Sequence, residues 1–233
     1  MSEKNIWDFL YSKLGNKYGA AGLMGNLYVE SRLNSKLLQS SYARKLGMTS
    51  EEYTAAVDNG LYSNFVHDSA GYGLAQWTYW SRKEALYSYA KSRDKSIGDL
   101  NMQLNYLWEE LQKYKTVVSV LKSAKSVREA SDVVVERYEK PKDMSEKAKQ
   151  NRANYGQEYY NKYSGEKKMD GKIVTTTADK VNIRSGNSKD YNKVGQVQKG
   201  ATFEWVATAE NGWHAIKYIN CVAWVSGEFS KVI

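Results

Sequence analysis

The stretch Ala20-Ala-Gly-Leu-Met-Gly-Asn-Leu-Tyr-Val-Glu30-Ser31 decides the fold of the first part of this chain. Its apolar residues recur at the spacing of a helix. Leu23 and Leu27 precede Glu30 by seven and three positions, so the glutamate shares a helix face with two leucines. Burial on such a face disfavours a carboxylate, and we expect Glu30 to keep its proton to a higher pH than a free glutamate and to donate it as a general acid. The alternative is a glutamate in a last helical turn that reaches back to water.

A second informative segment, Gly71-Tyr-Gly-Leu-Ala-Gln-Trp-Thr-Tyr-Trp80, combines glycines with aromatic, amide and hydroxyl side chains. Aromatic faces stack on the apolar side of sugar rings, amides and hydroxyls bind sugar hydroxyls, and glycine lets the backbone approach a ligand closely. The segment therefore predicts one wall of a saccharide cleft. An aromatic-rich turn in a protein core is the alternative interpretation.

Three motifs together resemble the phage tail-type lysozyme domain, a family of the lysozyme-like superfamily: Met24-Gly-Asn26, Glu30-Ser-Arg-Leu-Asn34 and Gly71-Tyr-Gly-Leu-Ala-Gln-Trp-Thr78. The resemblance covers residues 1–164 in element order. It implies cleavage of peptidoglycan glycan strands, with Glu30 as the catalytic acid. The substrate-binding residues that it implies are Tyr72, Gln76, Trp77 and Thr78.

A second catalytic carboxylate would lie about 5 Å from the acid in a retaining glycosidase and about 6.5 to 9.5 Å away in an inverting one. The acidic residues between the two motif segments are Glu51, Glu52, Asp58 and Asp68. Thr49-Ser-Glu-Glu52 matches a capping box, which gives Glu52 a structural role. Asp68 is our catalytic candidate because it lies next to the aromatic segment, although it could equally cap a turn. A lytic transglycosylase, which needs no second carboxylate, and a glucosaminidase stay open as alternatives.

Three other glutamates are assigned to the surface. In the helix predicted over 99–113, Glu109 and Glu110 fall outside the apolar stripe and are expected to be solvated. Tyr138-Glu-Lys-Pro141 contains the only proline and should end the preceding helix. A similar turn occurs in the resembling family. We interpret Glu139 as a surface-turn residue, and a position that braces the cleft from behind is the alternative.

The pattern changes near residue 165, which predicts two domains in this chain of 233 residues. Helices are expected over 3–14, 19–31, 49–57, 80–94, 99–113, 115–124, 126–138 and 145–163. Residues 165–170 have the composition of an exposed linker. Six short alternating segments between 171 and 233 predict a small β-barrel. The expected fold class is α+β and multidomain, with a mainly α-helical lysozyme-like domain over 1–164 and a small all-β SH3-like barrel over 171–233.

The second domain resembles a bacterial SH3-like (SH3b) cell-wall binding module. The landmarks are Val181-Asn-Ile-Arg-Ser-Gly186, Asn211-Gly-Trp213 and Ala223-Trp-Val225, with Ala223 at a position where relatives usually have glycine. The resemblance implies docking on wall peptides or glycans, which would hold the enzyme at its substrate. Its aromatic candidates are Tyr191, Trp205, Trp213 and Trp224.

Charge and composition narrow the function classes. The net charge of +8 favours attraction to polyanionic cell walls, whereas nucleic-acid binding is disfavoured because the basic residues are scattered. Two distant histidines and the single Cys221, which we expect to be buried, exclude a zinc site and a thiol nucleophile. We expect no cofactor and no metal. The oligomeric state is open, and a monomer is assumed.

No apolar run of about 18 residues occurs, so we expect no membrane insertion. The polar first residues lack the layout of a secretion signal. We therefore expect a phage endolysin of the muramidase type that stays in the host cytoplasm until lysis and then acts on the cell wall. A non-catalytic wall-binding or tail structural protein is the alternative from another class.

Overall fold

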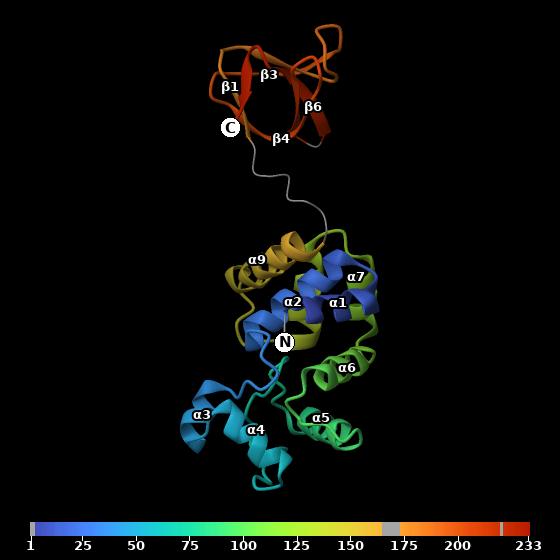
Figure 1. The fold of residues 1–233 in the computed structure, drawn as a ribbon, viewed down its shortest axis with the longest axis vertical. Coiled ribbons are helices and arrows are strands. Elements are labelled where there is room, and N and C mark those ends of the chain that lie inside the picture. The colour runs from blue at the N-terminus through green and yellow to red at the C-terminus, as the bar shows by residue number, and fades with distance from the viewer. Residues whose placement is uncertain (1–2, 165–172, 220) are drawn as a thin grey trace. The chain divides into compact units, whose positions relative to one another are not determined.

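The computed structural model describes residues 3–164, 173–219 and 221–233. The chain divides into two compact units, Met1–Gly165 and Glu166–Ile233, and each is described by itself. The predicted linker at 165–170 lies outside the described residues. Figure 1 shows that the first unit is helical and the second is built of strands, as the sequence predicts.

The helical unit follows the predicted order of segments closely. Its helices are α1 (Glu3–Leu14), α2 (Lys17–Ser31), α3 (Ser40–Leu46), α4 (Ser50–Asp58), α5 (Trp80–Lys91), α6 (Leu100–Leu111), α7 (Lys115–Ser123), α8 (Val127–Val134), the π-helical turn η1 (Val135–Glu139) and α9 (Glu146–Tyr163). Only α3 was not predicted, because it is short and buries no residue that would give an apolar period. No helix in the described part of the chain is long and apolar enough to span a membrane.

Helix α2 lies at the centre of this unit, where α1, α7, α8 and α9 pack around it (Figure 1). Asn16 caps its start by accepting hydrogen bonds from the backbone amides of Tyr18 and Gly19. Small residues let the neighbouring backbones come close: a Cβ on Gly25 would lie 2.4 Å from the backbone nitrogen of Gly156 in α9. The two glycines therefore set the separation between α2 and α9, and with it the position of the side chains that α9 directs toward the end of α2.

The starts of α4 and α8 agree with the capping signals in the sequence, whereas α5 begins after Tyr79 without a side-chain cap. Thr49 and Glu52 form the predicted capping box, and Ser126 accepts a hydrogen bond from the amide of Glu129. The segment before Pro141 ends as expected, but through an unusual turn. Helix α8 widens into η1, whose last hydrogen bond joins the Lys140 amide to the Val135 carbonyl at 2.9 Å. A π-helical turn is rare and recurs at functional sites.

The second unit is one antiparallel sheet with the order β3-β2-β6-β5-β4-β1-β7. Its strands are β1 (Ile173–Thr176), β2 (Val181–Arg184), β3 (Lys193–Val197), β4 (Thr202–Thr208), β5 (Trp213–Tyr218), β6 (Cys221–Ser226) and β7 (Ser230–Val232). Figure 1 shows the strands curling around a common interior. Val174, Ile183, Ile216 and Val225 fill that interior. The short final strand β7 was not predicted, and the expectation that Cys221 is buried is wrong, because it is exposed.

Candidate active site

A cavity of about 440 Å³ lies at the C-terminal end of α2. Its lining comes from the ends of helices and from the loops between them, which carry most of its polar groups. The lining residues are Glu30, Gln39, Gly71, Ala75, Gln76, Thr78, Tyr79, Arg82, Glu139 and Pro141. The cavity thus joins the two segments that the sequence singled out, the end of the glutamate helix and the glycine-rich segment after Asp68.

Glu30 occupies the last turn of α2, which Arg32 ends in a left-handed conformation (φ 55°). The Glu30 carboxylate accepts a hydrogen bond from Nη2 of Arg152 in α9 at 2.7 Å, and its side chain is 20% exposed. Nη1 of the same guanidinium lies 3.4 Å from Oδ1 of Asn26, one turn earlier on α2. The expected helix face is therefore present, with Leu23 and Leu27 both buried. The surroundings of Glu30 are not wholly apolar, because Arg152 forms an ion pair with its carboxylate.

Gln76 and Thr78 line the cavity together with Glu30. Gln76 adopts a left-handed backbone (φ 44°), and its amide nitrogen donates to the carbonyls of Leu37 and Gly73. Thr78 is exposed and donates its hydroxyl to the Gln76 carbonyl at 2.8 Å. A Cβ on Gly71 would lie 2.8 Å from Oε1 of Gln76, so glycine keeps this polar wall open. The substrate-binding role of both side chains stays a prediction, and their position is compatible with it.

Tyr72 and Trp77 require a correction, because both side chains are fully buried and have no surface to offer a ligand. The Tyr72 hydroxyl pairs with that of Thr54 at 2.6 Å, and the Trp77 indole donates to Oε2 of Glu110 at 2.9 Å. The core-turn interpretation therefore describes these two rings. The aromatic side chain that lines the cavity is Tyr79, which is 63% exposed.

Asp68 lies apart from the residues that line the cavity. Its carboxylate forms an ion pair with Lys83, whose side chain has no exposed surface, and it accepts hydrogen bonds from the Tyr53 and Tyr62 hydroxyls. Oδ1, the oxygen that pairs with Lys83, also accepts a hydrogen bond from the Ala70 amide at 2.9 Å. All of these partners are internal, and the Asp68 side chain is only 4% exposed. The structure thus gives Asp68 the capping and pairing role that was the alternative, and it does not bring Asp68 to Glu30.

Glu110 was expected to be solvated, and this expectation is wrong. The residue is buried, and its carboxylate accepts four hydrogen bonds: two from Arg82 at 2.7 and 2.8 Å, one from the Tyr138 hydroxyl at 2.5 Å and one from Trp77. Burial opposes ionisation, but the hydrogen bonds and charge of Arg82 lower the pKa of Glu110 below its usual value. Glu109, the neighbour expected on the same face, is exposed as predicted.

Glu139 is the site residue that the sequence analysis missed. It was interpreted as a surface-turn residue, yet it lines the same cavity as Glu30, and its Oε1 atom is buried without a hydrogen-bond partner. Burial, and next the negative charge of Glu30, raise the pKa of Glu139 to about 8. The alternative interpretation, in which Glu139 braces the cleft from behind, is closer to the structure, because Glu139 lines the cavity. The sequence signals were the helix stop at Pro141 and the similar turn in the resembling family.

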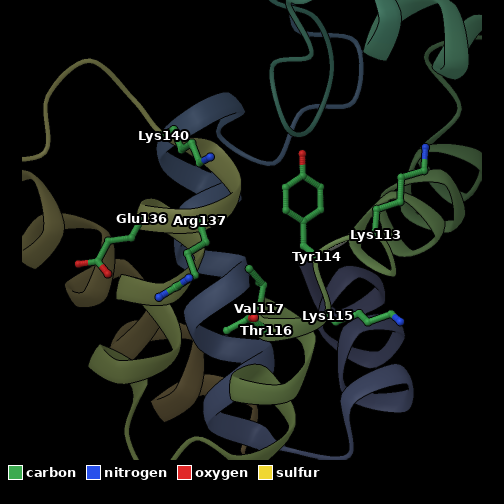
Figure 2. Close-up of a pocket in the computed structure, with 8 residues that line it drawn as sticks. All are labelled: Lys113, Tyr114, Lys115, Thr116, Val117, Glu136, Arg137 and Lys140. Atoms are coloured by element: carbon green, nitrogen blue, oxygen red, sulfur yellow. The ribbon is translucent and has the colours of Figure 1, made fainter.

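A second cavity, of about 610 Å³, lies between the start of α7 and η1 (Figure 2). Its charged lining is mostly basic: Lys113, Lys115, Arg137 and Lys140 carry positive charges. Glu136 is the only acidic residue in the lining, and it forms an ion pair with Lys149 at 2.5 Å. Figure 2 shows its carboxylate pointing away from Lys113 and Lys115. This cavity offers positive charge but no paired acid and base, so it is not a second candidate for glycosidic chemistry.

The strand unit has a cavity of its own, of about 320 Å³, lined by Trp213 and Phe229 together with polar and basic side chains. Trp213 is thus the aromatic candidate that faces a cavity, whereas Trp205 packs against the interior cluster and Tyr191 is 50% exposed. Among the residues that the structure describes, no group of three or more His, Cys, Asp or Glu side chains is arranged to hold a metal ion.

The fold and the cavity define a class of protein, a helical domain with a glutamate-lined cavity followed by a small antiparallel SH3-like domain. The chain belongs to the phage tail lysozyme family, whose sequence model matches residues 2–163. The bacterial SH3 domain model matches residues 179–231. A comparison with curated proteins finds no match. Family membership implies a glycoside hydrolase that acts on peptidoglycan.

Proposed function

We propose that this chain is a phage endolysin that hydrolyses glycosidic bonds of bacterial peptidoglycan as a muramidase, with Glu30 as the general acid. The observation that carries the proposal is the position of Glu30, which ends a central helix and lines a cavity with amide, hydroxyl and aromatic side chains. Membership of the phage tail lysozyme family supports the substrate class.

In this mechanism a glycan strand lies along the wall formed by Gln76, Thr78 and Tyr79. The hydroxyl and amide groups bind sugar substituents, and the exposed ring of Tyr79 stacks on a sugar face. Glu30 gives its proton to the glycosidic oxygen as the bond to the anomeric carbon breaks, and water then adds to that carbon. Arg152 holds the carboxylate in place between turnovers.

The strand domain supplies the second attachment. Its match to the bacterial SH3 family supports binding to the wall, and the cavity beside Trp213 is our candidate for the contact. Two attachment sites on one chain raise the effective concentration of the active site at its substrate. In this proposal the protein accumulates in the host cytoplasm and reaches the wall when another protein opens the membrane.

The proposal is tested by digesting purified peptidoglycan and identifying the new chain ends by mass spectrometry. Glu30→Gln should lower the rate of cleavage by roughly 10²- to 10⁴-fold, the usual contribution of a general acid. Binding of this variant to intact walls should not change, because the strand domain is untouched. Glu136→Gln is the matched control, since Glu136 is an exposed glutamate outside the cavity, and it should cleave normally. A Glu30→Gln protein as active as the wild type would refute the assignment.

The same products separate the alternatives. New reducing ends on muramic acid indicate a muramidase, those on glucosamine indicate a glucosaminidase, and anhydro-muramic ends indicate a lytic transglycosylase. Binding to walls with no cleavage by the wild-type protein would leave the non-catalytic wall-binding or tail structural protein.

A further inference from the structure

The charges around the cavity do not balance in pairs. Two arginines each have one carboxylate partner: Arg152 binds Glu30, and Arg82 binds Glu110. Glu139 is a fifth charged group beside these two ion pairs. The four paired side chains, which come from α2, α5, α6 and α9, are the charges that shift its pKa. Both cations are already neutralised by a closer carboxylate, so an ionised Glu139 would add an uncompensated negative charge to a partly closed space.

The local structure of Glu139 also leaves its carboxyl without support. Its Oε1 atom is buried and accepts no hydrogen bond, which is rare for a carboxylate because an unpaired buried oxygen is unfavourable. The π-helical turn η1 ends at this residue, and Lys140 follows in a left-handed conformation (φ 47°). Non-glycine residues adopt such a conformation only where surrounding structure holds them. The backbone thus presents Glu139 to the cavity that Glu30 also lines.

We propose that Glu30 and Glu139 act as a carboxyl pair in which Glu139 holds a proton in the resting enzyme and supplies it to Glu30, so that Glu139 is the positioning residue for the general acid. This inference rests on the proposed function of Glu30. The raised pKa of Glu139, near 8, agrees with it.

The ion pair between Arg152 and Glu30 raises the question of where the donated proton comes from, and Glu139 provides a source. Oε1 of Glu30 accepts a hydrogen bond from Arg152 and so does not carry the proton, and a neighbouring carboxyl in the same cavity is a source for it. When a glycan enters the cavity, the proton of Glu139 passes through Glu30 to the glycosidic oxygen, the bond to the anomeric carbon breaks, and both carboxyls are left ionised. The water that adds to the anomeric carbon returns one proton to the pair, so the resting state is restored.

The experiment compares the pH dependence of kcat/KM for the wild-type protein, Glu139→Gln and the control Glu136→Gln, all as full chains, on soluble peptidoglycan fragments. The wild type should lose activity as the pH rises through about 8, where Glu139 gives up its proton. In Glu139→Gln the alkaline limb should move at least about one pH unit lower, because the cavity then lacks the carboxyl that holds the proton. Glu136→Gln should keep the wild-type profile.

Infrared titration gives a second readout that does not depend on activity. The wild-type protein at pH 7 should show the carbonyl band of a protonated carboxyl, which disappears as the pH is raised above 8, and Glu139→Gln should lack this band. Absence of the band in the wild type overturns the proposal, even if Glu139→Gln does not fold.

An equal loss of activity at every pH in Glu139→Gln would also overturn it, because a merely structural role predicts that result. If Glu30→Gln is inactive while Glu139→Gln keeps the wild-type limb, the pair is refuted and the assignment of Glu30 stands. If the wild type does not cleave glycans, the proposed function fails. The infrared result still shows whether Glu139 is protonated at pH 7.

Discussion

Glu110 and Glu139 are two glutamates near one arginine, Arg82, but their hydrogen bonding and the direction of their pKa shifts are opposite. Glu110 accepts four hydrogen bonds and has a lowered pKa. Glu139 has a buried oxygen with no partner and a raised pKa. Full hydrogen bonding fixes a carboxylate in its charged form and makes it part of the framework. A buried carboxyl oxygen left without a partner favours the protonated form, and a group that keeps its proton near neutral pH is suited to proton transfer.

The largest effect on stability is expected at Glu110. Glu110→Ala should lower the free energy of unfolding of the helical domain by about 3–5 kcal/mol, because it leaves the Arg82 guanidinium partly buried and unpaired. Urea unfolding followed by helical circular dichroism measures this. Since the pKa of Glu110 is lowered in the folded state, its contribution is present above the unfolded pKa and is lost as the pH falls. The deficit of the variant should therefore shrink at acid pH, and a deficit that grows there would contradict the contrast with Glu139.

Asp68 extends the comparison to a third buried carboxylate with several partners. Asp68→Asn should destabilise the helical domain by roughly 2–4 kcal/mol, because it leaves the buried ammonium of Lys83 without its counter-charge. The folded variant should keep the wild-type pH profile of glycan cleavage. A displaced alkaline limb in this variant would instead support Asp68 as the second catalytic carboxylate, the role that the sequence suggested.

Glu139 should give the smallest change in stability, and one of opposite pH dependence. Its pKa rises from an ordinary 4.5 to about 8 on folding, so the folded state binds more protons between these values and the wild type loses stability as the pH rises through them. Glu139→Gln should remove this loss, which we expect to be roughly 1–3 kcal/mol between pH 5 and pH 8. Thermal unfolding of both proteins across that range measures the difference, and parallel curves would show that Glu139 is ionised throughout.

The sequence predicts the helices, most of the strands and the position of Glu30 because these depend on local spacing and capping. It fails where burial depends on partners distant in the chain. Glu110 lies outside the apolar stripe of its own helix, and its burial becomes favourable through Arg82, Tyr138 and Trp77, which are 28 to 33 residues away. Nothing in the turn at Glu139 shows that Glu30 lines the same cavity.

The aromatic segment shows the same limit in another form. Its composition fits both a sugar-binding wall and a core turn, and the structure divides it between the two. Tyr72 and Trp77 are buried, whereas Gln76, Thr78 and Tyr79 line the cavity. Periodicity cannot make this division, because the left-handed backbone at Gln76 breaks the regular alternation of the segment.

The contact between Gly25 and Gly156 makes helix spacing a control on the chemistry. Any side chain at Gly25 would meet the backbone of α9, so that helix, which carries Arg152, would have to move outward. A single methyl group placed there, although Gly25 does not line the cavity, would displace the arginine from Glu30. The residues tolerated at these two positions are therefore limited by the geometry of that ion pair as much as by packing.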